Sequence, residues 1–217
     1  MKILKLALIF LGIFLAFSIL VVAGLFTQLD QLITVSIQSQ LTKALDTPLS
    51  FLSLLGTFEI TTTFLVIILY FLKLRRSLIV MFMFTIGMGA ELLGKIFLYH
   101  PGPPKIFFRY NLDIIFPSGY IQTGHSFPSG HSFRTAFLAL LISYLIFQTK
   151  RLSAKSKRFL SALCFFFLFL MLVSRVSLGE HWTTDVIGGL FLGLGLGYLS
   201  VFILERKGLH PKFLRPL

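Results

Sequence analysis

Six long apolar runs, separated by short breaks that carry most of the charge, constrain this chain more than any other feature. A helix needs roughly 20 mostly apolar residues to cross the hydrocarbon core of a membrane. Backbone polar groups in lipid must be satisfied by a helix or a closed barrel, and long runs without alternation favour helices. We therefore predict an all-α, polytopic membrane protein, a bundle of six transmembrane helices over about Ile3–Phe26, Leu49–Leu72, Ser77–Tyr99, Ser132–Phe147, Phe159–Val173 and Asp185–Leu204.

The composition excludes an ordinary water-soluble domain. Hydrophobic residues make up 56% of the 217 residues and charged residues only 13%, whereas soluble domains are about a quarter charged. The net charge of +12 is also typical of nucleic-acid binding proteins. Here the basic residues sit in short breaks between apolar runs, which is typical of membrane topology. We therefore expect a membrane bilayer and no nucleic acid as the partner.

The basic residues predict the orientation of the chain. One side of the predicted bundle carries 14 of the 20 Lys and Arg residues: Lys2, Lys5, Lys73, Arg75, Arg76, Lys150, Arg151, Lys155, Lys157, Arg158, Arg206, Lys207, Lys212 and Arg215. The basic-rich side of a membrane protein is cytoplasmic. Both termini are then inside, and the loops 26–48, 100–131 and 174–184 face outward. We expect an integral protein of a bacterial cytoplasmic membrane.

The chain reads as a single membrane-embedded domain over residues 1–217, without an internal repeat. The first run, with Lys2 and Lys5 before it, also has the charged start of a signal peptide, but it exceeds the usual 7–15-residue apolar core. The single cysteine, Cys164, cannot form an intrachain disulfide. The 100–131 loop is rich in Pro, Gly and aromatic residues, so we expect a partly structured rim at the membrane interface.

Three polar clusters fall at the outward ends of the predicted helices. In Ser174–Asp185, His181 and Asp185 are four residues apart and share a face if both lie on the first turn of the sixth helix. A carboxylate bonded to one imidazole nitrogen leaves the other nitrogen free to attack. Arg175 adds a planar fork that suits phosphate oxygens. Interfacial anchoring explains each of these residues alone, but not the set at this spacing.

The second cluster, Phe127–His131, places Ser129 and Gly130 at the start of the fourth predicted helix. Free backbone N–H groups at a helix N-terminus favour an anion. His131 lies where it could protonate a leaving alkoxide. Alone, this stretch would be a turn and an N-cap. The third cluster begins at Lys95, and Glu91 lies one helical turn before it, so we expect these two side chains to pair.

Together the clusters resemble the type 2 phosphatidic acid phosphatases. That superfamily includes bacterial phosphatidylglycerophosphate, undecaprenyl pyrophosphate and lipid A phosphatases. Its pattern is Lys-x6-Arg-Pro, then Pro-Ser-Gly-His, then Ser-Arg-x5-His-x3-Asp. The second part is intact at Pro128–His131, and the third at Ser174, Arg175, His181 and Asp185. The resemblance also extends to six helices over nearly the whole chain.

The resemblance implies a role for each matched residue. His181 would be the nucleophile that forms a phosphohistidine, Asp185 would orient it, and His131 would protonate the departing lipid hydroxyl. The phosphate oxygens would be held by Lys95, Ser129, Gly130 and Arg175. This chemistry needs no metal and no cofactor.

The chain departs from the family pattern at one position. The arginine expected seven residues after Lys95 is replaced by Gly102. The candidates to replace this phosphate ligand are Arg134, one turn beyond His131, then His100, and finally Lys105 and Arg109 in the loop. We favour Arg134, because an ionisable residue within an apolar helix is a functional candidate.

The leading hypothesis is therefore a membrane phosphatase that hydrolyses a phosphomonoester or diphosphate of a lipid on the outer face. Candidate substrates are undecaprenyl pyrophosphate, phosphatidylglycerophosphate, phosphatidate and lipid A phosphates. Two alternatives stay open: a lipid phosphotransferase on the same scaffold, and a non-catalytic phospholipid-binding or transport protein. Clustering of the polar residues at one interface disfavours transport, whose sites lie near the midplane. The sequence does not indicate the oligomeric state.

Overall fold

The structure is a computed structural model that describes residues 1–71, 77–114, 116–120 and 124–206. Every regular element in these ranges is a helix. In chain order they are α1 (Lys2–Val22), α2 (Thr27–Gln40), η1 (Lys43–Leu45), α3 (Asp46–Leu54), α4 (Phe58–Phe71), α5 (Ser77–Phe97), η2 (Lys105–Phe107), η3 (Pro117–Tyr120), α6 (Gly130–Gln148), α7 (Ala154–Ser177) and α8 (Thr183–Arg206). The predicted all-α class is confirmed.

Five helices, α1, α5, α6, α7 and α8, are long and apolar enough to cross a membrane. A sixth candidate span consists of two pieces, Lys43–Leu54 and Phe58–Tyr70, which meet at an angle of 49°. The predicted second segment is therefore broken at residues 55–57 and does not form one straight helix. Its last residue, Leu72, and six of the basic residues used for orientation (Lys73, Arg75, Arg76, Lys207, Lys212 and Arg215) lie outside the described residues.

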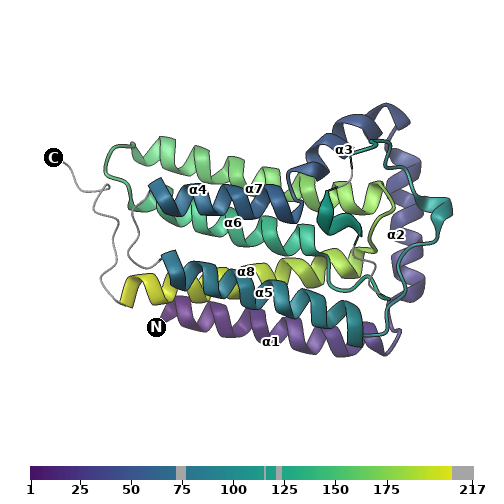
Figure 1. Cartoon of the computed structure of the whole chain (residues 1–217), viewed down its shortest axis with the longest axis horizontal. Helices are drawn as coiled ribbons and strands as arrows, with labels where there is room; N and C mark the ends of the chain where they lie inside the picture. Colours follow the sequence, from purple (N-terminus) through teal and green to yellow (C-terminus); the bar gives the residue numbers. More distant parts are fainter. Residues whose placement is uncertain (72–76, 115, 121–123, 207–217) are drawn as a thin grey trace.

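The spanning helices run side by side, and α2 lies across the end of the bundle opposite the N-terminus (Figure 1). The sequence analysis treated residues 26–48 as an outward loop, so α2 was not expected. Its sequence mixes polar and apolar residues, and its Asp30 and Thr34 are buried against the bundle. All three polar clusters of the sequence lie at this same end.

Large apolar side chains cover the outer surface of the bundle. Ile9 on α1, Phe82 on α5 and Phe166 on α7 each expose more than half of their surface. A water-soluble monomer rarely exposes contiguous apolar patches of this extent. These faces suit contact with lipid chains.

Close packing of α8 on α6 joins two of the polar clusters. A methyl group on Gly189 would overlap the carbonyl oxygen of Ser129, and one on Gly193 would overlap the carbonyl oxygen of Phe133. Small residues let membrane helices approach to backbone contact. The N-terminal ends of α6 and α8 are thereby held together, and the Ser129 N–H donates to the carbonyl oxygen of Asp185 at 2.9 Å.

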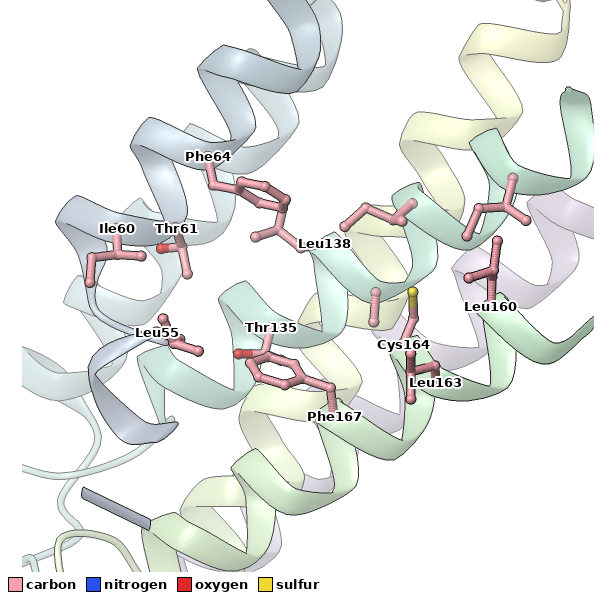
Figure 2. A pocket seen from close by; sticks show the side chains of 13 residues that line it. Leu55, Ile60, Thr61, Phe64, Thr135, Leu138, Leu160, Leu163, Cys164 and Phe167 are labelled. Carbon is pink, nitrogen blue, oxygen red and sulfur yellow. The ribbon is translucent and has the colours of Figure 1, made fainter. Parts of the chain in front are cut away.

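The bent span leaves an apolar cavity of about 600 Å³ between α4, α6 and α7 (Figure 2). Its walls are almost entirely hydrocarbon, from Leu55 near the bend to Leu160 and Ile146 near the far ends of α7 and α6. Among the described residues that line it, the polar side chains are Thr61, Thr135 and Cys164.

Candidate active site

A histidine–aspartate pair stands at the start of α8. His181 Nδ1 lies 3.2 Å from Asp185 Oδ2, and the Trp182 backbone N–H donates to the same oxygen at 2.9 Å. The sequence placed both residues on the first helical turn, whereas His181 precedes α8 by two residues. The bond predicted from the i, i+4 spacing forms nonetheless. With Nδ1 held by the carboxylate, Nε2 is the nitrogen left for a substrate.

Burial and nearby cations decide the protonation state of the His181 ring. Its pKa lies well below the usual 6.5, first because burial disfavours the charged ring and then because Arg175 and Lys95 are positive. A neutral imidazole is the form that can act as a nucleophile. This environment keeps His181 neutral at physiological pH.

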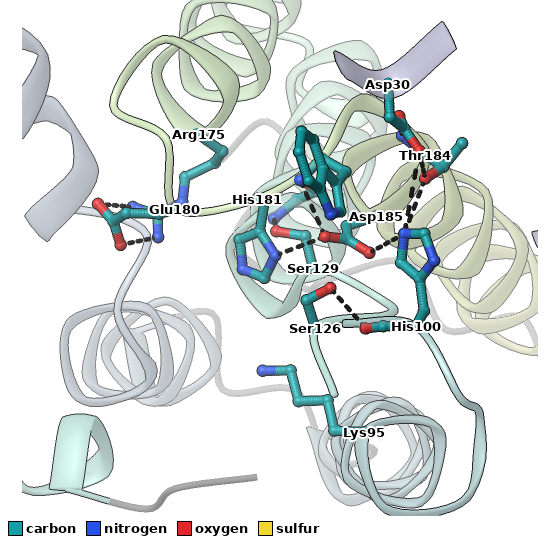
Figure 3. Close-up of polar contacts among 12 residues, drawn as sticks. Asp30, Lys95, His100, Ser126, Ser129, Arg175, Glu180, His181, Thr184 and Asp185 are labelled. Carbon is teal, nitrogen blue, oxygen red and sulfur yellow. Dashed lines mark hydrogen bonds and ion pairs between the residues drawn. The ribbon is translucent and has the colours of Figure 1, made fainter. Parts of the chain in front are cut away.

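A second group of polar side chains supports Asp185 from behind. His100 Nε2 lies 3.4 Å from Asp185 Oδ1 and 3.2 Å from the Thr184 hydroxyl. Asp30, from α2, accepts from the Thr184 N–H at 2.9 Å and from its hydroxyl at 2.6 Å. Asp30 is 2% exposed and Asp185 is fully buried, so this network is closed to water (Figure 3).

The network explains two features of the sequence. His100, a candidate for the missing phosphate ligand, contacts Asp185 and Thr184. Asp30 was missed, because a single acidic residue in a polar segment gives no signal of its partner 154 positions away. Asp30 satisfies a free N–H at the beginning of α8, the role usually taken by an adjacent N-cap residue.

Arg175, near the end of α7, is held by Glu180 and Ser53. It donates to Glu180 through both terminal nitrogens, one of them at 2.9 Å from Glu180 Oε1, and it also contacts the Ser53 hydroxyl. Gly179, with φ of +70°, turns the chain between α7 and Glu180. A carboxylate and a phosphate present similar paired acceptors to a guanidinium. Glu180 therefore occupies the fork that a phosphate would use.

The helix N-terminus expected at Pro128–His131 is formed. Ser129 is the N-cap of α6, and its hydroxyl accepts from the Ser132 N–H at 3.5 Å. A methyl group on Gly130 would overlap the Glu91 carboxylate, so Gly130 leaves room for Glu91 where α6 meets α5. The ring of His131 packs against Gly56 at the bend between α3 and α4. A Cβ atom added to Gly56 would lie 2.7 Å from the Cδ2 atom of that ring.

Glu91 joins two cations beneath this terminus. Lys95 Nζ lies 2.8 Å from Glu91 Oε1, which confirms the predicted pairing, and Arg134 Nη1 lies 2.9 Å from Oε2. Arg134 Nε also donates to the Gly56 carbonyl at 3.0 Å. Arg134 thus reaches the floor of the site beside His131, but it does so as the partner of Glu91.

The other candidates for the missing arginine lie elsewhere. Arg109 pairs with Asp46 at 2.7 Å and bonds carbonyl oxygens of α2 and its end. Lys105 is exposed on the surface of the loop. Gly102 is exposed, and the carbonyl oxygen of the preceding Pro101 accepts from the Trp182 indole at 2.8 Å. The loop therefore approaches the site through its backbone.

The residues converge from four elements. In the view of Figure 3, His181 lies between the Arg175–Glu180 pair and the network of Asp185, His100, Thr184 and Asp30, while Lys95 reaches toward it from α5. Within the described residues, no three His, Cys, Asp or Glu side chains are grouped closely enough to hold a metal ion. The arrangement combines the His181–Asp185 pair with a second histidine, His131, at a helix terminus and with the cations Lys95 and Arg175.

The chain belongs to the PAP2 superfamily, whose family model matches residues 76–208. A 78-residue stretch is 37% identical to phosphatidylglycerophosphatase B of Bacillus subtilis (strain 168), over 36% of this chain and 38% of that protein. A 106-residue stretch is 31% identical to phosphatidylglycerophosphatase B of Haemophilus influenzae, over 46% of this chain and 43% of that protein. The matches thus span less than half the length of these curated relatives.

The fold is shared with a solved structure. The crystal structure of the first transmembrane PAP2 type phosphatidylglycerolphosphate phosphatase, from Bacillus subtilis, superposes with a TM-score of 0.75. The alignment covers 92% of this chain and 96% of that one, at 22% sequence identity. This likeness shows that the six-span arrangement is the fold of a transmembrane PAP2 protein.

Proposed function

We propose that the protein is a membrane lipid phosphatase that hydrolyses a phosphomonoester of a glycerophospholipid, of the phosphatidylglycerophosphate or phosphatidate type. The observation that carries this proposal is the contact between His181 Nδ1 and Asp185 Oδ2 at 3.2 Å, next to a cationic fork. The names of the two relatives, both phosphatidylglycerophosphatase B, support the substrate class. Apolar outer faces on the spanning helices fit a substrate that stays in the bilayer.

The reaction would proceed in two displacements. His181 Nε2 attacks phosphorus, the bond from phosphorus to the lipid oxygen breaks, and His131 gives its proton to that oxygen. Asp185 stabilises the charge that develops on the His181 ring. Water then attacks the phosphohistidine and gives a proton to His131, the phosphorus–nitrogen bond breaks, and inorganic phosphate leaves.

The transition-state charge would be met by cations already in place. Phosphoryl transfer depends mostly on positioning and on electrostatic stabilisation of the equatorial oxygens. Arg175 would exchange Glu180 for two of these oxygens, and Lys95 would meet a third. The N–H groups at the start of α6, next to Ser129 and Gly130, would bind the remaining charge.

The experiment is phosphate release from a panel of lipid phosphates and diphosphates by the purified chain in detergent, with EDTA present. Wild type should release phosphate and His181→Ala should not. Brief incubation with ³²P-labelled substrate and an acid-free quench should trap an acid-labile phosphohistidine in wild type alone. Absence of both phosphate release and labelling in wild type would contradict the proposal and favour a binding protein. Labelling that is discharged only by an added acceptor lipid would instead indicate a phosphotransferase.

We also propose that the site faces outward, with the termini in the cytoplasm. The basic residues Lys150 and Arg151 lie between α6 and α7, and Lys155 lies in the first turn of α7, at the end opposite the site. On a Cys164→Ser background, Lys105→Cys should react with a membrane-impermeant maleimide in intact cells, and Lys155→Cys only after lysis. The reverse labelling pattern would show that the site faces the cytoplasm.

A further inference from the structure

The bend segment, residues 53–57, joins the two halves of the bent span. It lies at the site end of the bundle, and from there α4 runs back alongside α6 (Figure 1). The match to the family model begins at residue 76, so the bend segment lies outside the matched range. It nevertheless contacts Arg134, Arg175 and His131. The bend segment is therefore a part of the site that the family pattern does not describe.

Tight turns produce the bend and leave a carbonyl oxygen for the site. The N–H groups of Gly56 and Thr57 donate to carbonyl oxygens three residues back, at 2.9 and 3.1 Å, and the Thr57 hydroxyl donates to the Leu54 carbonyl at 2.8 Å. Bonds to the third residue back tighten the end of a helix. Backbone groups freed at a break in a membrane helix take partners from neighbouring helices. Here Arg134 Nε, on α6, donates to the Gly56 carbonyl at 3.0 Å.

Gly56 leaves space for the ring of His131. A Cβ atom at this position would lie 2.7 Å from His131 Cδ2 and 3.0 Å from Met171 Sδ. The Met171 side chain is flexible and adapts to a new neighbour. The His131 ring is short and is attached to the first turn of α6. A side chain at position 56 would therefore displace the ring of the proposed proton donor.

Ser53 holds the Arg175 guanidinium from its buried side. Arg175 Nη1 donates both to the Ser53 hydroxyl and to Glu180 Oε1, whereas Nη2 donates to Glu180 Oε2. Ser53 is 2% exposed, and the Glu180 side chain is 21% exposed. A phosphate that enters from solvent would displace the more exposed partner and leave the buried one. One N–H on each terminal nitrogen would then be free, which is the arrangement that binds phosphate through two parallel bonds.

We propose that the bend segment positions the two sides of the active site. Ser53 keeps the Arg175 guanidinium oriented while phosphate replaces Glu180, and Gly56 keeps the His131 ring beside the leaving oxygen. Both are positioning residues, because each acts through another side chain. A single segment that contacts the phosphate ligand and the proton donor fixes the spacing between them, and phosphoryl transfer depends on such positioning. The assignment rests on the phosphatase function proposed above.

The test of Ser53 is calorimetric titration of the purified full chain in detergent with inorganic phosphate. Without the hydroxyl, the Arg175 guanidinium would move outward with Glu180 and would have to be reordered for each phosphate. Ser53→Ala should therefore raise Kd about three- to tenfold, the effect of ordering one flexible side chain. Ser53→Thr keeps a hydroxyl and should bind phosphate within about twofold of wild type.

The matched control is Ser50→Ala. Ser50 lies one turn earlier on α3 and is also buried, and among the described residues its hydroxyl has no hydrogen-bond partner. This variant should bind phosphate as wild type does. Equal affinity in Ser53→Ala and wild type, an equal loss in Ser53→Thr, or no binding by wild type would overturn the role of Ser53.

The test of Gly56 compares two substrates that differ in their leaving group. A lipid alkoxide needs a proton in order to leave, whereas p-nitrophenolate leaves without one. Gly56→Ala should lower kcat/KM at least about tenfold for the lipid phosphate and less than about threefold for p-nitrophenyl phosphate, because general acid catalysis contributes about 10²–10⁴-fold. The ratio of the two kcat/KM values does not depend on how much of the variant is folded.

The control for this comparison is Gly89→Ala on α5. An added Cβ atom there would make no contact with another element within 4 Å, so the ratio should stay that of wild type. An unchanged ratio in Gly56→Ala would overturn the role of Gly56. If wild type releases no phosphate from any lipid, the phosphatase proposal fails, and the calorimetric comparison alone decides the role of the bend segment.

Discussion

Arg134 offers the sharpest test of how this site manages without the arginine of the family pattern. Its side chain is 6% exposed and that of Glu91 is 8% exposed, with 2.9 Å between their charged atoms. Removing one partner of a buried ion pair typically destabilises a protein by about 3–5 kcal/mol. Because Glu91 still pairs with Lys95 at 2.8 Å, we expect Arg134→Met to lower the free energy of unfolding by about 3 kcal/mol, near the lower end of this range.

The expected effect is measurable as a shift in the thermal midpoint. One kcal/mol corresponds to about 2–4 °C for chains of 150–250 residues, so Arg134→Met should lower Tm in detergent by about 6–12 °C. The double variant Glu91→Leu/Arg134→Met removes both charges of the pair and should recover part of this loss, because apolar pairs often replace buried ion pairs without penalty; the recovery is incomplete because Lys95 loses its partner Glu91. The control, Arg158→Met on the exposed surface of α7, should shift Tm by less than about 2 °C.

Activity then separates a phosphate ligand from a structural partner. If Arg134 stabilises the transition state, the double variant regains part of the lost Tm but keeps kcat/KM reduced at least tenfold. If the double variant regains both, Arg134 does not replace the missing arginine. An unchanged Tm in the single variant, or a double variant no more stable than the single, would refute the reasoning about the buried pair.

The other predictions concern His181, Asp30 and Glu180. Because burial and neighbouring cations lower the pKa of His181, the neutral nucleophile should persist below pH 6.5, and the acid limb of kcat/KM should lie below that value; a limb at or above 6.5 would contradict this. For the same reason the folded state loses stability as pH falls below 6.5, and His181→Gln should flatten that fall in Tm. Asp30→Ala removes the acceptor of the buried Thr184 N–H and one of the two partners of its hydroxyl. We therefore expect the free energy of unfolding to fall by about 2–3 kcal/mol and kcat to fall with KM nearly unchanged. No change in either would show that α2 is only a surface helix. Glu180→Gln replaces the carboxylate that pairs with the Arg175 guanidinium by a neutral amide. Inorganic phosphate should therefore inhibit the variant at a several-fold lower concentration than wild type. Equal inhibition would show that Glu180 does not compete with phosphate for Arg175.

The sequence predicted what local periodicity and a short motif can encode. Long apolar runs fix the spans, because lipid leaves the backbone few alternatives. The i, i+4 spacing fixes the pairs His181–Asp185 and Glu91–Lys95, because residues one turn apart face each other. Both pairs formed, even though α8 begins after His181.

Features set by contacts distant in sequence were not predictable in this way. The bend at residues 55–57 divides a span that reads as one apolar run, and α2 reads as a polar loop. Asp30 meets Thr184 only because α2 folds across the end of the bundle. Glu59, in the first turn of α4, accepts from the N–H and hydroxyl of Ser118 in the 100–131 loop, at 2.7 and 2.9 Å.

The charges around the site suggest why the motif tolerates glycine at position 102. Lys95 and Arg134 are both paired with the carboxylate of Glu91, and Arg175 is paired with that of Glu180. A buried site that held a fourth cation without a counter-ion would be strongly disfavoured before substrate arrives. A phosphate dianion that displaces one carboxylate from its cation brings compensating charge with it. On this argument a fourth cation matters less than a cation that its carboxylate can release to the substrate. Arg175 fits this description, because its partner Glu180 lies on a glycine-containing turn.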